Sequence, residues 1–388
     1  MNRHCTRLVD RSFFSVAMLA CVLETAAAEV NFLRVPDGGI QPQALTDPMG
    51  AVHLLYFKGE PSGGDLFYVR RSRGESTFSR PIRVNSQPAS AIATGTIRGG
   101  QLALGQGGRI HVAWNGHAPV GGNYMQAPML YTRLNTEGTA FEPERDVIGQ
   151  ARGLDGGGSV AADSKGNVYV TWHAPKPGNT RGEVGRAVFL ARSRDDGRSF
   201  APERLVYGQE TGACGCCGMK TFVDSHGSVF LSYRGASESG NRDQIFLAAH
   251  DGDLNFRVVL DHPWKVGACP MSSTALVQAG QRVLGAWETA GKVYWTSWVR
   301  TDAAPSAPVT PPDLGKNPKH PVVVGNSRGE TLLAWTEGTG WARGGDVAWQ
   351  RFDATGKPMG EKGMMSGLPT WSLVAAVTDQ EDRFVVIY

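Results

Sequence analysis

A repeated unit constrains the fold of this chain more than any other feature of its sequence. Each copy has a small-residue segment, a polar turn that usually contains glycine, and an alternating apolar stretch that ends in an aromatic residue. The closing aromatics are Tyr56, Trp114, Trp172, Tyr233, Trp287, Trp335 and, in a weaker last copy, Tyr388. The period is roughly 50 residues, which falls in the range of repeat architectures built from one supersecondary unit each.

The segments between the closing aromatics predict further strands. Residues 66–70 and 188–192 have the pattern of a third strand, and residues 204–206 that of a short fourth strand. Strands at a spacing of about ten residues, without a helical pattern, are typical of an all-β fold. Radial packing of four-stranded units leaves only short sheet edges. The sequence therefore predicts an all-β β-propeller; two stacked β-sandwiches, the alternative, would not need so regular an aromatic repeat.

Blade number and domain limits follow from the same repeat. Seven inner strand pairs can be counted, but the seventh ends at Tyr388 without outer strands of its own. Residues 30–34 have a strand pattern and are expected to supply an outer strand there, which would close the ring. No linker or low-complexity stretch divides the chain, and the proline-rich residues 301–319 are interpreted as one long connection between blades. Residues 29–388 are expected to form a single domain.

The N-terminus has the three parts of a secretory signal peptide: a basic start, an apolar run too short for an ordinary membrane span, and small residues at a cleavage site. These are Arg3, Arg7 and Arg11, then residues 13–23, then Ala26, Ala27 and Ala28. Residues 1–28 are therefore predicted to be a signal peptide, and the protein to be secreted or periplasmic. Lipoprotein processing at Cys21 is the competing interpretation. No later segment is long and apolar enough to cross a membrane.

The charge balance limits the classes of partner. The formal net charge of the whole chain is +3 at pH 7, and removal of the signal peptide leaves the mature chain close to neutral. Such a balance predicts neither nucleic-acid nor membrane-surface binding. A small molecule, a glycan or a protein at the propeller face remains as the expected partner, and the sequence leaves the oligomeric state open.

One turn carries a family resemblance. Residues 193–200, Ser-Arg-Asp-Asp-Gly-Arg-Ser-Phe, resemble the Asp-box (BNR repeat) of the sialidase superfamily, Ser-x-Asp-x-Gly-x-Thr-Trp. Weaker copies lie at residues 72–78 and 135–141, so the pattern extends over most of the mature chain. The resemblance implies a sialidase-like propeller with six blades, whereas the repeat count gives seven. It is less specific for function, because one fold supports many activities.

The catalytic residues of that family carry over poorly. The family holds a substrate carboxylate with three arginines and uses a Tyr–Glu pair as nucleophile and an Asp as acid/base. Residues 32–36 are similar to the motif of its first arginine, but alignment on the Asp47 turn places Gln41 at that position and Arg34 on a preceding outer strand. Loss of one arginine weakens carboxylate binding. Tyr233 closes a blade, which favours a core role, and no catalytic residue is assigned.

Polar residues at the starts of the predicted inner strands are the candidate ligand-binding residues. Loops at these points line the axial mouth of a propeller, where ligands usually bind. The candidates are Gln41, Arg98, Asp155, Lys220 and His320. The alternative interpretation is that they are rim residues in contact with water, and for His320 that it packs beside Pro321.

A cysteine cluster is the sharpest local signal. Cys214-Gly-Cys216-Cys217 and Cys269 each lie at the entry to a predicted innermost strand, and the two blades are consecutive. Because innermost strands converge on the axis, we expect all four sulfurs to lie close together.

Three interpretations of this cluster stay open. Structural disulfides are usual in an oxidising compartment, with Cys214–Cys269 as one pairing. A soft metal ion, copper or zinc, would suit the thiols and the neighbouring thioethers of Met219 and Met271, although such methionines more often pack than ligate. A redox-active cysteine pair is the third. Copper or zinc is thus the only cofactor that the sequence suggests.

Taken together, these patterns predict an exported propeller that binds a ligand at its axial mouth and has a cysteine-rich rim. A sialidase-like glycoside hydrolase is the first alternative, and whether the chain is an enzyme stays open. A non-catalytic scaffold that docks another protein is the second alternative.

Overall fold

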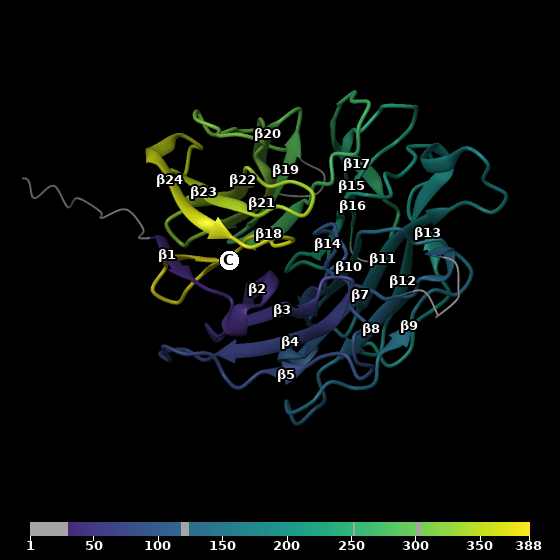
Figure 1. Ribbon diagram of the computed structural model, residues 1–388, viewed down its shortest axis with the longest axis horizontal. Helices are drawn as coiled ribbons and strands as arrows, with labels where there is room; N and C mark the ends of the chain where they lie inside the picture. Colours follow the sequence, from purple (N-terminus) through teal and green to yellow (C-terminus); the bar gives the residue numbers. More distant parts are fainter. Residues whose placement is uncertain (1–29, 118–123, 251–252, 300–303) are drawn as a thin grey trace, which may run out of the picture.

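The computed structural model describes residues 30–117, 124–250, 253–299 and 304–388, which form seven small β-sheets arranged in a ring (Figure 1). The chain passes once round the ring, from purple to yellow, and each sheet is one blade. Five blades have four strands and two have three. The predicted all-β propeller is confirmed, with the seven blades of the repeat count and not the six of the family resemblance.

In blades 1 to 4 the strands follow the chain from the axis outward. Blade 1 consists of β2 (Ile40–Thr46), β3 (Val52–Glu60), β4 (Gly63–Arg71) and β5 (Ile82–Arg83), and blade 2 of β6 (Gln101–Leu104), β7 (Ile110–Asn115), β8 (Met129–Arg133) and β9 (Arg145–Asp146). Blade 3 consists of β10 (Gly158–Ala162), β11 (Val168–Pro175), β12 (Arg186–Ser193) and β13 (Arg204–Leu205), and blade 4 of β14 (Lys220–Val223), β15 (Val229–Arg234), β16 (Gln244–Ala249) and β17 (Arg257–His262).

Blades 5 to 7 complete the ring. They consist of β18 (Ala275–Ala279), β19 (Arg282–Thr289) and β20 (Lys292–Trp298), then β21 (Lys319–Gly325), β22 (Thr331–Glu337), β23 (Gly345–Phe352) and β24 (Pro358–Leu368), then β25 (Ala375–Thr378), β26 (Phe384–Ile387) and β1 (Val30–Leu33). The only helices in the described parts are four short 3₁₀ turns: η1 (Pro36–Gly38), η2 (Gln106–Gly108), η3 (Tyr124–Gln126) and η4 (Gly182–Gly185). In blade 5 the proline-rich connection supplies Val309, which exchanges two backbone hydrogen bonds with Trp295.

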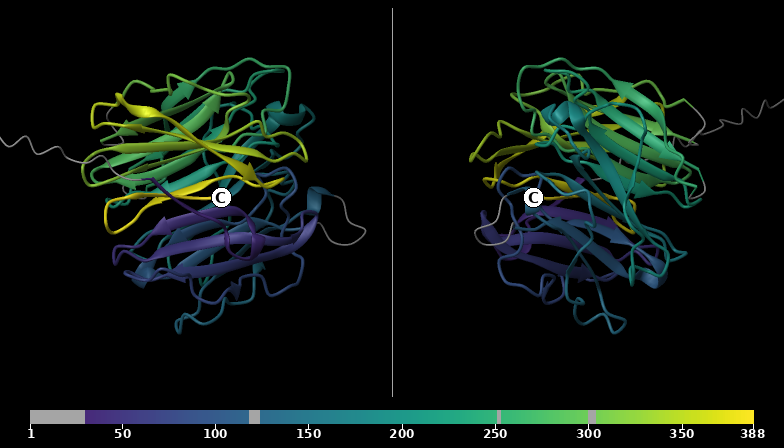
Figure 2. Two further views of the ribbon diagram at one scale, coloured as in Figure 1. Left: turned by 60° about the vertical axis from the view of Figure 1, so that its left-hand side comes forward. Right: turned by 90° about the vertical axis from the view of Figure 1, so that its right-hand side faces the viewer.

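The two chain ends meet in blade 7. β1 pairs with β26 in parallel, with Val30 opposite Phe384 and Leu33 opposite Ile387. The purple N-terminal and yellow C-terminal strands accordingly lie next to each other in the side views of Figure 2. This confirms that residues 30–34 supply the missing outer strand and close the ring.

Packing between neighbouring blades forms the core. Seven apolar clusters occur in the described chain, and each lies between two adjacent blades. Side chains alternate across each strand because the strand period is two. In β11, for example, Val170 and Trp172 pack towards blade 2, whereas Tyr169 packs towards blade 4. All seven closing aromatics, including Tyr233, are buried in these interfaces.

Aspartates at the entry to the second strands hold the turns, as their side chains favour. In blade 1, Asp47 Oδ1 accepts hydrogen bonds from the backbone N–H groups of Met49 at 2.9 Å and Ala51 at 2.8 Å. Asp163 and Asp224 accept the equivalent bonds in blades 3 and 4. Part of the repeat therefore comes from one recurring side-chain-to-backbone interaction.

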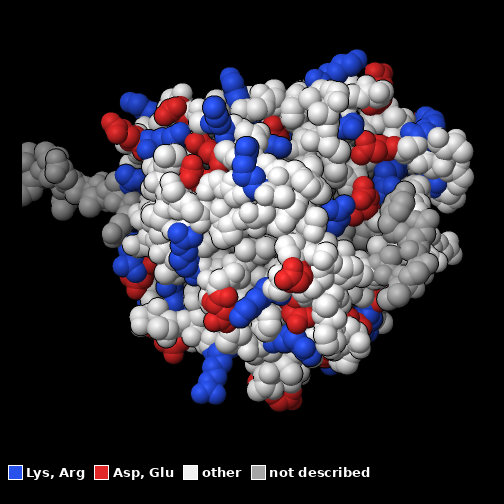
Figure 3. Space-filling view, in the orientation of Figure 1, with Lys and Arg blue, Asp and Glu red and all other residues white. Residues whose placement is uncertain are grey.

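The surface agrees with the near-neutral charge of the chain. On the face drawn in Figure 3, acidic and basic side chains are interspersed around the periphery and the centre is mostly uncharged. Within the residues described, no helix has the length and apolar character needed to cross a membrane. The predicted signal peptide, residues 1–28, and the alternative lipid-attachment residue Cys21 lie outside the described residues.

Candidate functional site

The innermost strands of the blades enclose the ring axis. Two cavities lie along it: one of about 110 Å³ beside the starts of these strands and one of about 330 Å³ beside their ends. The loops that enter the innermost strands all come from the preceding blade and gather at the first of these two ends. We call that end the mouth.

Strained backbone is concentrated at the mouth. Non-glycine residues rarely adopt positive φ, and such residues cluster at functional sites because the surrounding structure must hold them. Among the described residues, seven of them lie in an innermost strand or within five residues before one, with φ between 50° and 63°: Asp37, Gln41, Thr96, Met271, Asn317, His320 and Trp371. The mouth is therefore the candidate functional site.

The loop of residues 93–99 covers the end of the axial cavity. The oxygen of Ala93 accepts a hydrogen bond from Gln41 Nε2 at 2.6 Å. Thr96 Oγ1 lies 3.5 Å from His320 Nε2 on the other side of the ring. Arg98 ends the loop and pairs with Asp155, its Nη2 lying 3.0 Å from Asp155 Oδ1. A ligand at this end meets the loop before it meets the cavity.

The five predicted mouth residues all lie at this end, but at two depths. Arg98 and Asp155 reach the surface. Gln41 and His320 are each only 4% exposed, beneath the loop. Lys220 lies beside the axial cavity, where its Nζ is 3.3 Å from Gln101 Oε1. The surface pair is thus in reach of a ligand, whereas the other three contact the loop or the cavity.

Burial also sets the charge of the deep residues. It lowers the pKa of His320 to about 3, with a smaller contribution from the positive charge of Lys319. The imidazole is therefore neutral at ordinary pH and bonds to Ser273 Oγ at 3.2 Å through Nδ1. Burial likewise lowers the pKa of Lys220 to about 8, so its amine can lose its proton in mildly alkaline solution.

Two tryptophans at the mouth were not identified from the sequence. Trp341 is 64% exposed, and its ring packs edge-on against that of Trp371 with 4.8 Å between the centroids. A methyl group placed on Gly95 would lie 2.8 Å from Arg98 Nη1, 3.5 Å from Met271 Cε and 3.8 Å from Trp341 Cζ3. The side chains of Arg98, Met271 and Trp341, which come from three different loops at the mouth, therefore converge near Gly95. A tryptophan outside the repeated aromatic position was the available signal.

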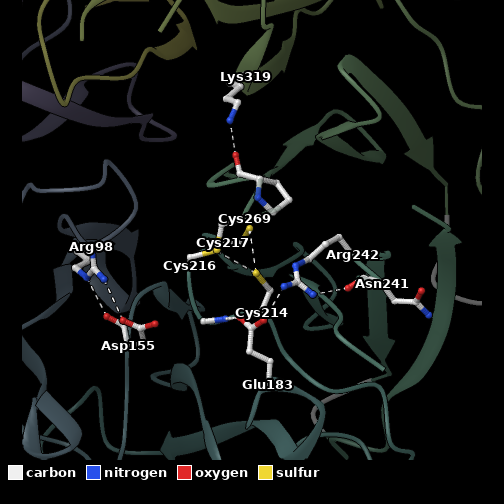
Figure 4. Close-up of a disulfide and its surroundings, with 12 residues drawn as sticks. Arg98, Asp155, Glu183, Cys214, Cys216, Cys217, Asn241, Arg242, Cys269 and Lys319 are labelled. Atoms are coloured by element: carbon white, nitrogen blue, oxygen red, sulfur yellow. Dashed lines mark hydrogen bonds and ion pairs between the residues drawn. A yellow bond between two sulfur atoms is a disulfide. The ribbon is translucent and has the colours of Figure 1, made fainter. Parts of the chain in front are cut away.

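The cysteines form one cluster at the mouth, as predicted (Figure 4). A disulfide joins Cys216 to Cys269 and links the entry loops of blades 4 and 5. Cys214 Sγ lies 3.3 Å from Cys216 Sγ and 3.5 Å from Cys217 Sγ, and both Cys214 and Cys217 are free thiols. The suggested Cys214–Cys269 pairing is wrong because Cys214 is buried below the rim, whereas Cys216 reaches the exposed Cys269.

A glutamate from η4 positions the cysteine loop. Glu183 Oε1 accepts a hydrogen bond from the Gly215 N–H at 2.7 Å, and Glu183 Oε2 from Arg242 Nη2 at the same distance. Figure 4 shows Glu183 below Cys214 and Arg242 to the right of it. The two cysteine segments are also joined by their backbones, since the Gly218 N–H donates to Ser272 O at 2.9 Å.

The pKa values of the two free thiols, Cys214 and Cys217, are shifted in opposite directions. Burial raises the pKa of Cys217, but a hydrogen bond donated by Cys214 opposes it. The positive charge of Arg234 and the backbone N–H groups of Ser272 and Met271 lower the pKa further, so it lies below the ordinary thiol value. The same hydrogen bond, with burial, raises the pKa of Cys214. Cys217 is therefore the thiolate of the pair and Cys214 the thiol.

The donor set fits a soft metal ion only in part. The sulfurs of Cys214, Cys216 and Cys217 lie within 4.8 Å of one another, close enough to share an ion if the disulfide were reduced. Met219, however, packs in the apolar cluster between blades 3 and 4. Met271 extends towards Gly95, which lies in the loop of residues 93–99. With the disulfide formed, only two thiols remain as ligands.

The residues considered for sialidase chemistry lie away from the mouth or in the core. Arg34 donates to Gly367 O at 2.8 Å and lies over the Tyr388 ring at 4.1 Å, on the outer part of blade 7. Tyr233 is buried, with its hydroxyl 2.8 Å from Thr211 Oγ1. Asp155 and Glu183 are the carboxylates beside the cysteine loop, and each is held in an ion pair with an arginine.

Comparisons with known proteins agree with this architecture. No protein-family model matches the sequence, and no curated protein matches it. Among solved structures, the chain is similar to Hadza microbial sialidase Hz136, with a TM-score of 0.51 and 12% identity over 82% of this chain and 70% of that one. It is similar also to the α-L-arabinanase of Penicillium chrysogenum, with a TM-score of 0.52 and 13% identity over 83% of this chain and 95% of that one. Likeness at such identities concerns the fold alone, and the chain is a seven-bladed, sialidase-like β-propeller.

Proposed function

We propose that this protein is an exported propeller that binds a glycan at its mouth. The observation that carries the proposal is the exposed ring of Trp341, held against Trp371 beside the Arg98–Asp155 ion pair. We call these four residues the mouth patch. Trp341 is supported by a second aromatic ring and flanked by charged groups, and it is the only mostly exposed tryptophan of the described residues, the others being buried or half-buried.

The chemistry of the mouth patch suits a sugar ring. One face of a pyranose or furanose presents C–H groups, which pack on an indole face, while its hydroxyls need polar partners at the edge. Asp155, 43% exposed at its side chain, offers carboxylate oxygens to such hydroxyls, and Arg98 beside it fixes their position. The Penicillium arabinanase, which has a similar fold, is known in complex with arabinobiose.

Binding without hydrolysis is the form of the proposal that the mouth supports. A glycosidase needs a proton donor and a nucleophile or base that converge on one bond. The two carboxylates beside the cysteine loop, Asp155 and Glu183, are engaged by arginines. We therefore expect no hydrolysis of 4-methylumbelliferyl glycosides, including that of N-acetylneuraminic acid, whether or not the protein binds them. Turnover at a rate abolished by Asp155→Asn would instead establish the glycoside hydrolase.

Titration of the variant Trp341→Ala with glycans tests the binding. Tryptophan fluorescence and calorimetry are measured with a panel of neutral and acidic oligosaccharides, arabinobiose included. We expect saturable binding by the native protein and at least about a fivefold loss of affinity in Trp341→Ala, because stacking on an aromatic ring contributes about 1 kcal/mol or more.

The matched control is Met364→Ala, which removes another large exposed side chain, on β24 and outside the mouth patch. Equal affinities of the two variants would place the ligand elsewhere. No binding across the panel by the native protein, together with retention of a partner protein by both variants, would favour the scaffold alternative.

A further inference from the structure

The cysteine cluster has a redox chemistry of its own that the glycan proposal does not use. We propose that it is a thiol–disulfide exchange centre, in which the buried Cys214–Cys217 dithiol reduces the exposed Cys216–Cys269 disulfide and so presents reactive thiols at the mouth. The chemical class of its substrate is an external disulfide.

The placement of the four sulfurs suits this exchange. Cys214 and Cys217 are each 3% exposed, and Cys269 lies at the surface of the rim. The 3.3 Å from Cys214 Sγ to Cys216 Sγ brings a nucleophile against one sulfur of the disulfide. The 3.5 Å from Cys214 Sγ to Cys217 Sγ brings the second thiol against the first. The buried pair thus touches the rim disulfide through one contact, at the half-buried Cys216.

The exchange balances without an outside oxidant. Cys214 passes its proton to the Cys217 thiolate along their hydrogen bond, and the Cys214 sulfur attacks Cys216 Sγ. The Cys216–Cys269 bond breaks, and Cys269 leaves with the electron pair and takes a proton from water. Cys217 then attacks Cys214, and Cys216 leaves with the electron pair and with the proton that Cys217 gives up. The disulfide has moved to Cys214–Cys217, and two thiols stand at the rim.

The surroundings of the buried pair support a negative charge there. Arg234 is only 2% exposed and lies over the ring of Trp264 at 5.2 Å. Among the described residues its Nε has no hydrogen-bond partner, although its two terminal nitrogens donate to the backbone carbonyl oxygens of Arg242 and Glu288. A buried cation close to Cys217 keeps one thiol deprotonated, and the thiolate is the form that attacks a disulfide.

The rim thiols would then reduce a bound disulfide once. One thiol attacks the external disulfide R–S–S–R′ and releases R–S⁻, and the second displaces R′–S⁻ and restores the Cys216–Cys269 bond. The chain ends with two disulfides, so each turnover needs a dithiol reductant to restore the starting state. The inner dithiol acts as a store of two electrons.

Native labelling with N-ethylmaleimide tests the exchange. The folded mature protein is alkylated, quenched and mapped by mass spectrometry, without denaturant before the quench. We expect the label on Cys216 and Cys269 and a recovered Cys214–Cys217 disulfide, because alkylation of the exposed thiols draws the exchange towards them. Recovery of an intact Cys216–Cys269 disulfide, with label on Cys214 and Cys217 alone or on no cysteine, would overturn the proposal.

Two serine variants and a control separate exchange from local unfolding. Cys214→Ser removes the attacking sulfur, so labelling of Cys269 is lost. Cys217→Ser stops the reaction at a Cys214–Cys216 disulfide with Cys269 labelled alone. Met219→Leu, a volume-conserving change beside the cluster, keeps the native labelling pattern. Labelling of Cys269 that persists in Cys214→Ser would contradict the mechanism.

Elemental analysis of the purified protein tests the metal alternative. One equivalent of copper or zinc, with all four thiols reduced, would replace the exchange centre by a metal site. These outcomes are independent of the glycan proposal, because Trp341→Ala leaves all four cysteines in place and is expected to label like the native protein.

Discussion

Asp195 shows how a single exposed side chain holds a hairpin between two outer strands. Its Oδ1 accepts hydrogen bonds from the Ser199 N–H at 2.9 Å and the Ser193 hydroxyl at 2.7 Å, and its Oδ2 from the Ser199 hydroxyl at 2.6 Å. Ser193 Oγ in turn accepts from the Gly197 N–H at 2.8 Å. The hydrogen bonds from Ser199 do most to lower the pKa of Asp195 below its ordinary value.

We expect Asp195→Ala to lower the free energy of unfolding by about 1–2 kcal/mol at neutral pH, since a net hydrogen bond contributes about 1 kcal/mol. A carboxyl whose pKa is lower in the folded state stabilises the protein above its unfolded pKa and stops doing so as pH falls. The difference between variant and native protein should therefore shrink below about pH 4. Urea unfolding at pH 7 and pH 3.5 measures it, with Glu137→Ala in another exposed turn as control. A difference independent of pH would show that the carboxylate charge is not involved.

At the scale of the element, β1 is the strand that closes the ring. It lies parallel to β26, and two backbone hydrogen bonds continue the pairing, from the Val35 N–H to Tyr388 O at 3.0 Å and from the Tyr388 N–H to Leu33 O at 3.1 Å. Phe32 anchors the strand against Trp349, with 4.5 Å between ring centroids. A strand from one chain end thus completes a blade made from the other end.

Phe32→Ala should lower the free energy of unfolding by about 2 kcal/mol, less than for a fully buried phenylalanine because this ring is half-buried. Loosening of β1 should also raise hydrogen exchange at β26, its neighbour in the sheet. Asn31→Ala, one residue earlier and on the other face of β1, is the matched control. Faster exchange throughout all blades, without a local effect in blade 7, would contradict a specific role in closure.

At the scale of the whole molecule, the inter-blade disulfide bears on the predicted export. The bond between Cys216 and Cys269 closes a segment of 53 residues and joins blades 4 and 5 at the rim. In the chain-entropy model a loop of that length stabilises the folded state by at most about 4 kcal/mol. Such a bond forms in an oxidising compartment and not in a reducing cytoplasm. If the signal peptide predicted for residues 1–28 directs export, this disulfide can form in the mature protein.

Expression of the full chain in a bacterial host with an oxidising periplasm should yield a mature protein that begins at Glu29. Deletion of residues 1–28 should retain the chain in the cytoplasm with Cys216 and Cys269 reduced, and its melting temperature should be several degrees lower than that of the exported form. Amino-terminal sequencing, thiol counting and calorimetry measure the three quantities. A lipid attached at Cys21 would replace cleavage after Ala28, and equal melting temperatures of the two forms would show that the disulfide contributes little.

The repeat, the turn aspartates and the closing aromatics were sufficient to predict the all-β propeller and its closure by residues 30–34, because strand alternation and turn chemistry depend on near neighbours in the chain. The repeat count indicated seven blades, but the family resemblance left six open, and the structure decided for seven. The same repeat placed the four cysteines together, since equivalent positions of adjacent blades meet at the axis. What only the tertiary structure decided depends on the paths of loops across the ring. The loop of residues 93–99 determined that His320 is buried and that Arg98 stays at the surface. The depth of each sulfur determined the disulfide partner. The contacts near Gly95 placed Trp341 at the mouth. Neither could be predicted from the sequence, because contacts between distant loops leave no periodic pattern in it.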